Sequence, residues 1–194
     1  MRFRRAIPTA GLIVAAFTLP AASARNPVPS KLDLPPPLQL TRTISAEDLL
    51  IATQKLLPKG AFLGPLLDTR YAVIKRDWLA RKFVPAYREA LAALQEASRG
   101  SGEEGADCDD FGMFLRHMIG LSGMLAGTAQ PAAAKVVAFQ EKSFSGVGRT
   151  HERHAIGLFL TDEGWYVLEP QNPSALVPLN SYPNQTRLQY ITYH

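Results

Sequence analysis

The sequence has almost no cysteine: of its 194 residues, only Cys108 is one. A chain with a single cysteine cannot form a disulfide within itself, so no disulfide framework holds this fold together. Three roles remain for the thiol: it is buried and inert, it pairs with a second chain, or it is kept because it reacts. The residues around and after Cys108 favour the reactive role.

Long apolar runs are also absent beyond the first 24 residues, where no stretch approaches the ~18 apolar residues of a membrane helix. Residues 1–24 have the layout of a secretory signal peptide, with a basic start, a short apolar run over residues 11–19 and small residues at 22–24 for cleavage. We therefore expect a periplasmic or secreted protein that has no membrane span after signal removal.

An excess of one charge is missing as well. The whole sequence has 21 Lys and Arg against 17 Asp and Glu, a formal net charge of +4. Residues 1–24 contain three arginines and no acid, which leaves 18 basic and 17 acidic residues in the rest of the chain. No basic stripe with interleaved aromatics is present either, so the charge pattern argues against nucleic acid as a partner.

The remaining length fits a single domain with one core. Residues 25–43 are rich in proline and are expected to form an extended lead-in outside that core. Residues 44–194 are then the domain itself.

Helical patterns occupy the first half of this domain. Ser45 is a candidate N-cap, with Asp48 three residues further on in a variant of the capping box. Apolar residues at helical spacing then run from about Thr69 to Ser98, and Pro85 should kink or divide that helix.

A third helix is predicted to start at Asp107 or Cys108 and to close at Gly120 and Gly123. Its apolar residues fall on one stripe: Cys108, Phe111, Leu115, Met118 and Ile119. The rest of the chain has five short runs typical of strands: Lys135–Lys142, His154–Thr161, Trp165–Glu169, Leu176–Leu179 and Arg187–Tyr193. Helices followed by strands predict an α+β fold, with N-terminal helices packed on an antiparallel sheet of about five strands.

A cysteine at a helix N-terminus has its thiolate favoured by the helix dipole, and as a nucleophile it needs a base and a group that orients the base. His154 opens an apolar strand, and Glu169 follows 15 residues later, after one tight turn and a short return strand. Such a hairpin brings Glu169 back towards the imidazole, although its register leaves Gln171 and Asn172 as alternative partners. The other histidines are mid-helix, in a polar loop and at the C-terminus: His117, His151 and His194.

Two segments carry a family resemblance. Residues 108–112 (CDDFG) resemble the Cys-x-Asp-Tyr/Phe-Ala motif of transglutaminase-like proteins, and residues 154–170 resemble their His-Ala…Gly-Trp…Asp-Pro hairpin. The chain is similar to the bacterial transglutaminase-like cysteine proteinases over roughly residues 100–182. This resemblance implies a papain/transglutaminase-like fold and a periplasmic cysteine peptidase that acts on a protein or peptide substrate, with room for a regulatory partner.

The resemblance also implies roles for single residues. Cys108 is the nucleophile, His154 the base, and Glu169 the orienting group in the place where the family usually has Asp. No cofactor is required for such a triad.

Five carboxylates surround the cysteine in sequence: Glu103, Glu104, Asp107, Asp109 and Asp110. Nearby negative charge opposes formation of a thiolate. The acids can face solvent, cap the helix N-terminus, or bind Ca²⁺, which is suited to carboxylate oxygens. For the third case the resemblance implies calcium at Asp107 and Asp109.

An alternative from another functional class stays open. The same fold could serve as a non-catalytic module that binds a peptide or a partner protein in its cleft. Its motivation is the Glu at position 169, the acidic surroundings of the thiol, and the lack of an identifiable oxyanion donor other than the backbone N–H of Cys108.

Overall fold

The structure, a computed structural model, describes residues 33–57, 62–98, 108–140, 153–183 and 188–192. The predicted signal peptide lies outside these residues, as do Glu103, Glu104 and Asp107. None of the helices formed by the described residues has the length and apolar character that crossing a bilayer requires.

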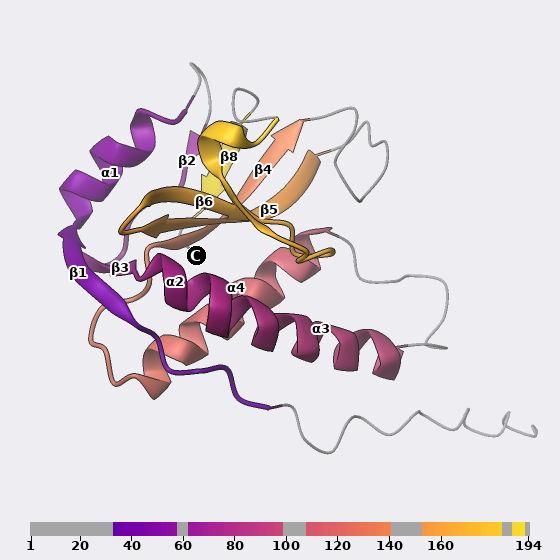
Figure 1. The fold of residues 1–194 in the computed structure, drawn as a ribbon. Coiled ribbons are helices and arrows are strands. Elements are labelled where there is room, and N and C mark those ends of the chain that lie inside the picture. Colours follow the sequence, from indigo (N-terminus) through magenta and orange to yellow (C-terminus); the bar gives the residue numbers. More distant parts are fainter. Residues whose placement is uncertain (1–32, 58–61, 99–107, 141–152, 184–187, 193–194) are drawn as a thin grey trace, which may run out of the picture.

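Helices dominate the first half of the chain and strands the second, so the fold is α+β (Figure 1). The helices are α1 (Ala46–Gln54), α2 (Arg76–Trp78), α3 (Val84–Ser98) and α4 (Cys108–Leu125), with a π-helical segment η1 (Leu79–Phe83) and a 3-10 turn η2 (Leu179–Ser181). The strands are β1 (Leu40–Ser45), β2 (Phe62–Leu63), β3 (Arg70–Ile74), β4 (Ala134–Gln140), β5 (Arg153–Thr161), β6 (Gly164–Leu168), β7 (Leu176–Pro178) and β8 (Leu188–Thr192).

The strands of the described chain form one mixed sheet. The five predicted strands correspond to β4 to β8, and the pairs β4–β5, β4–β8, β5–β6 and β6–β7 are all antiparallel. The prediction missed β1, β2 and β3. Since β2 pairs with β8 and β3 with β5 in parallel, the sheet is not purely antiparallel.

The helical prediction for residues 69–98 is wrong at its start, where Arg70–Ile74 is the strand β3. Four consecutive buried residues show no helical period, and their aromatic and β-branched side chains suit a buried strand. The helix begins only at Arg76, whose backbone N–H donates to Asp162 Oδ1 at 2.8 Å. The expected interruption at Pro85, which lacks an N–H, takes the form of the wide π turn η1 just before it.

The lead-in predicted at residues 25–43 is partly built into the fold. Its last residues, Leu40 to Thr43, belong to β1. Leu38 is buried in the core, and its N–H donates to the carbonyl of Ser122 in α4 at 2.8 Å. The extended segment is therefore a strap across α4 and not a free linker at this point.

Helix α4 packs directly on β5, and Figure 1 shows it together with α3 beneath the sheet. The helix runs through Gly120 and Gly123, where the prediction ended it, to Leu125. Of the predicted apolar stripe, Leu115, Met118 and Ile119 are fully buried. Gly157 of β5 faces Leu115 so closely that a Cβ atom there would collide with it.

Candidate functional site

The hairpin β5–β6 brings His154 and Glu169 together. Its strands pair from Thr161 opposite Gly164 to Gly157 opposite Leu168, and Gly164 takes a positive φ of 109° at the turn. This register returns Glu169 to the open end of the hairpin, where the Nε2 atom of His154 lies 2.8 Å from the Oε2 atom of Glu169. Glu169, one of the three partners left open by the sequence, thus contacts the imidazole.

Both members of this pair are shielded from water. The side chain of His154 is 3% exposed and that of Glu169 is 14% exposed. Within the described part of the chain, the second carboxylate oxygen of Glu169, Oε1, is buried and has no hydrogen-bond partner. A carboxylate that holds Nε2 of an imidazole fixes the orientation of the ring and favours its Nε2–H form, which leaves Nδ1 as the nitrogen able to accept a proton.

The first turn of α4 lies at the same end of the molecule. Within the described residues α4 starts at Cys108, whose side chain is half-buried. Phe111 follows one turn later, and its carbonyl is 3.3 Å from the hydroxyl of Tyr87 in α3. The same hydroxyl lies 2.9 Å from the carbonyl of Pro170, the residue after Glu169. Tyr87 therefore joins the start of the cysteine helix to the Glu169 segment.

The sequence pattern does not mark Tyr87 for this role, because the residue falls among the apolar residues at helical spacing between Thr69 and Ser98. It is fully buried, and its ring stacks on Phe83 at 6.3 Å between centroids. Burial, and to a lesser degree the charge of Glu169, raises the pKa of Tyr87 above its ordinary value. The available signal was the hydroxyl itself, because a buried tyrosine usually has a partner for its O–H.

The acids near the cysteine divide between described and undescribed residues. Asp109 and Asp110 are exposed in the first turn of α4, where negative charge suits the helix dipole. Asp107, the other residue of the implied calcium pair, lies outside the described residues. Among the residues that the structure does describe, no three His, Cys, Asp or Glu side chains gather in a way that could hold a metal ion.

A surface hollow of about 410 Å³ lies beside the segment that follows Glu169. The guanidinium of Arg88 in α3 donates to the carbonyl of Pro173 at 2.8 Å and so holds one wall of the hollow in place. Gln95, Gln171 and Asn172 contribute polar groups to its lining.

The remaining described histidine, His117, lies on the exposed side of α4. Its Nδ1 atom is 2.8 Å from the carbonyl of Met113 one turn earlier, a contact within the helix itself.

Comparisons with known proteins give a likeness of fold alone. No family model matches the chain, and no curated protein matches it. A solved structure described as "PSL1a-E64 complex" superposes with a TM-score of 0.51 at 17% sequence identity. The match covers 78% of this chain and 50% of that chain, so this chain spans about half the length of its structural neighbour.

Proposed function

We propose that the chain is a periplasmic or secreted cysteine hydrolase that cleaves an amide bond of a peptide or protein. The observation that carries this proposal is the buried hydrogen bond between His154 and Glu169 at the end of the molecule where the Cys108 helix starts. A base held by a carboxylate next to a helix that begins with cysteine is the arrangement that nucleophilic catalysis needs.

In the proposed reaction the Cys108 thiolate attacks the carbonyl carbon of the scissile amide, and a C–S bond forms as the C–N bond breaks. The helix dipole at the start of α4 favours the thiolate. Nδ1 of His154 takes the thiol proton and gives it to the leaving amine. Water then hydrolyses the thioester and regenerates the thiol.

The proposed role of Glu169 is to orient His154 through Nε2 and to stabilise the imidazolium that forms. Glutamate is one methylene longer than the aspartate usual in the resembled family. At 2.8 Å, the longer side chain reaches the imidazole with ordinary hydrogen-bond geometry. The substitution therefore does not weigh against the triad.

The finer fold assignment, papain/transglutaminase-like, is part of this proposal. Two features support it: the helix that begins with the cysteine, and its packing against the hairpin that carries His154 and Glu169. The neighbour of similar fold is named as a complex with E64. E64 is therefore a reasonable compound to test on this chain. Hydrolysis is favoured over cross-linking because the resembled proteins are proteinases.

The test is the rate at which iodoacetamide labels Cys108 at neutral pH, followed by intact-mass spectrometry. We expect labelling much faster than that of free cysteine, and about tenfold or more slowing in His154→Ala, because the base no longer supports the thiolate. Glu169→Gln keeps a hydrogen bond to the ring and should slow labelling less. His117→Ala, which removes an exposed histidine from α4, is the matched control. Preincubation with E64 should protect the thiol.

Labelling as slow as that of free cysteine, and unchanged in His154→Ala, would contradict the proposal. Such a result would favour a non-catalytic module that binds a peptide or partner on the same fold. The observation behind this second candidate is the pair of carboxylates, Asp109 and Asp110, in the first turn of α4, whose charge opposes a thiolate. Peptide binding without turnover by the unlabelled protein would then identify that module.

A further inference from the structure

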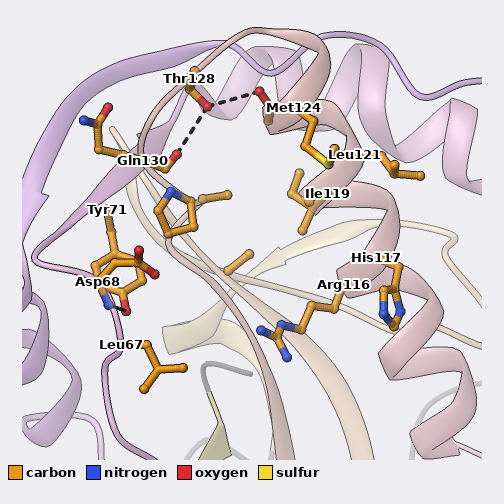
Figure 2. Close-up of a pocket in the computed structure, with 15 residues that line it drawn as sticks. Leu67, Asp68, Tyr71, Arg116, His117, Ile119, Leu121, Met124, Thr128 and Gln130 are labelled. Carbon is orange, nitrogen blue, oxygen red and sulfur yellow. Dashed lines mark hydrogen bonds between the residues drawn. The ribbon is translucent and has the colours of Figure 1, made fainter.

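A second cavity lies along the other half of α4, away from the candidate active site. It has a volume of about 570 Å³, within the usual range for a small-molecule site. Figure 2 shows side chains of α4, the segment around Thr128 and Gln130, and the segment around Leu67 and Tyr71 enclosing it. Neither Cys108 nor His154 nor Glu169 lines it. Among the charged residues that line the cavity from α4, Arg116 is the nearest to Cys108. It is eight residues away, about 12 Å along the helix axis.

Most of the cavity wall is apolar. Its apolar lining residues are Ile119, Leu121 and Met124 of α4, Pro131, Ala132 and Ala134 of the segment that leads into β4, and Leu67. Two of these side chains are unusually open to water: Leu67 is 75% exposed and Met124 is 77% exposed. They lie on opposite sides of the cavity, one on α4 and one on the facing segment, so that an apolar ligand body could contact both.

The wall also carries one half-buried cation. Figure 2 shows the Arg116 side chain extending into the cavity from α4. Burial lowers the pKa of Arg116, and the neighbouring Tyr71 opposes that change. An arginine stays charged under either influence, so the cavity holds a positive charge with reduced access to water. Such a charge favours an anion that brings its own hydrogen-bond acceptors, and a carboxylate fits the planar guanidinium.

The other titratable groups limit how much negative charge a ligand can carry. Asp68 is exposed at the rim, and its backbone N–H donates to the hydroxyl of Tyr71 at 3.2 Å. His117 is at the α4 side, with Nδ1 on the carbonyl of Met113. Asp68 adds a negative charge to the lining, which disfavours a second carboxylate on the ligand. The lining therefore fits one negative charge and an apolar body.

We propose that this cavity binds a monocarboxylate with an apolar body, its carboxylate on Arg116 and its body against Ile119, Met124 and Ala134. Two sources share this chemistry: a free carboxylic acid of medium chain length, and the C-terminal carboxylate of a peptide that ends in an apolar residue. The proposal does not depend on the function assigned to Cys108, and the site stands whether or not the chain is a hydrolase.

Gly120 is a position in the cavity wall where a larger side chain can be placed without a clash at its Cβ atom. It lines the cavity from within α4, and a Cβ atom added there would have no neighbour within 4 Å. In Gly120→Phe a ring can extend from this open position into the space that the ligand would take. The helix tolerates this change, because glycine is a poor helix former.

The experiment is isothermal titration of the whole chain with octanoate and with N-acetyl-Ala-Leu, which has a free C-terminus. The matched neutral probes are octanamide and N-acetyl-Ala-Leu-amide, and octanedioate carries a second charge. We expect at least one monocarboxylate to bind, and its neutral and dianionic counterparts to bind roughly tenfold or more weakly. Arg116→Gln should weaken binding to a similar degree. Gly120→Phe should abolish it, and Arg81→Gln, which changes an exposed arginine elsewhere, should leave it unchanged.

Each outcome of the titration leads to a different conclusion. Binding of octanoate alone assigns the site to free acids, and binding of the peptide alone assigns it to peptide termini. Equal affinity for the charged and neutral probes, or undiminished binding in Gly120→Phe, would overturn the proposal, as would failure of both monocarboxylates to bind at millimolar concentration. Thermal unfolding of each variant shows that a loss of binding is not a loss of fold. Iodoacetamide labelling of Cys108 should be unchanged in Gly120→Phe, which keeps this test separate from that of the proposed hydrolase.

Discussion

At the scale of single residues, the hydroxyl of Tyr87 links parts of the chain that are otherwise far apart. It lies within hydrogen-bond distance of Phe111 in the first turn of α4 and of Pro170 beside Glu169. The tyrosine ring that carries this hydroxyl is buried and packs against Phe83 and Phe114. The position of the cysteine helix relative to the His154–Glu169 pair therefore depends on a group that itself takes no part in the proposed chemistry.

Tyr87→Phe removes this hydroxyl, and the carbonyls of Phe111 and Pro170 then lose its hydrogen bond in the protein interior. We expect a loss of about 1–3 kcal/mol in the free energy of unfolding, measured by urea denaturation. We also expect slower iodoacetamide labelling of Cys108, because the helix start and the Glu169 segment are no longer joined. Unchanged stability together with unchanged labelling would mean that the packing of the ring suffices.

The stability of the same variant should also depend differently on alkaline pH. Since the pKa of Tyr87 is raised in the folded protein, the folded state keeps this proton when the unfolded chain loses it. The stabilising contribution is therefore complete below about pH 10 and is lost as the pH rises further. Tyr87→Phe should lose less stability than the parent over that range, and equal losses would argue against a buried neutral hydroxyl.

At the scale of secondary-structure elements, the close contact between α4 and β5 sets the distance from helix to sheet. Gly157 permits this contact because it offers no side chain to Leu115. The contact holds the helix that starts at Cys108 against the strand that starts near His154. A change in this spacing would move both groups relative to each other.

Gly157→Val introduces a Cβ atom too close to the Cδ2 atom of Leu115, so that the buried Leu115 side chain must shift. We expect a loss of about 1–3 kcal/mol or more in the free energy of unfolding, because a packed interface must shift to admit it. Gly120→Ala on the open side of the same helix is the control, and it should gain about 0.5–1 kcal/mol. Chemical denaturation of both variants provides the comparison. A tolerated valine would show that α4 is not held at this distance.

How far the sequence predicted these elements depends on the range of the interactions that form them. The pairing of His154 with Glu169 was predictable because a short hairpin has few ways to close. The capping of α1 by Ser45 was confirmed for the same reason, since Ser45 Oγ accepts from the backbone N–H of Asp48 three residues away at 3.1 Å. Local patterns predicted both contacts, although they left Gln171 and Asn172 open as alternative partners of His154.

Other features depend on partners distant in sequence. The strand β3 was predicted as helix, because a short apolar run does not by itself distinguish the two, and its main partner β1 lies in the proline-rich segment. The parallel pairing of β2 with β8 involves only two residues in each strand. The Tyr87 hydroxyl signals that a partner exists but does not identify it, and the cavity beside Arg116 has no local signature. Both are formed by segments that meet only in the folded chain.

At the scale of the whole molecule, the N-terminal strap connects the surface to the core. Leu38 packs into the main cluster with α3 and α4, although it belongs to a segment that resembles a linker in composition. The strap continues into β1, which pairs with β3. The beginning of the domain is therefore held at two places, by the burial of Leu38 in the core and by the pairing of β1 with β3.

Leu38→Ala should lower the free energy of unfolding by about 2–5 kcal/mol, since it removes a buried side chain whose space cannot refill completely. Leu34→Ala is the matched control: Leu34 is 68% exposed in the same segment, and its loss should change stability by less than about 0.5 kcal/mol. Thermal or urea unfolding measures both. Similar values for the two variants would mean that the strap contributes little.

The contacts of Tyr87 also bear on the order in which the molecule assembles. Its two partners are 24 and 83 positions away along the chain. Contacts that enclose long loops are slow to form, because the ends must first be brought together at a cost in chain entropy. In an unfolded chain the thiol and the imidazole are separate groups with ordinary chemistry. Any reactivity of Cys108 that depends on His154 therefore reports that the two halves of the chain have met. The rate at which this reactivity appears during refolding then measures the rate of folding.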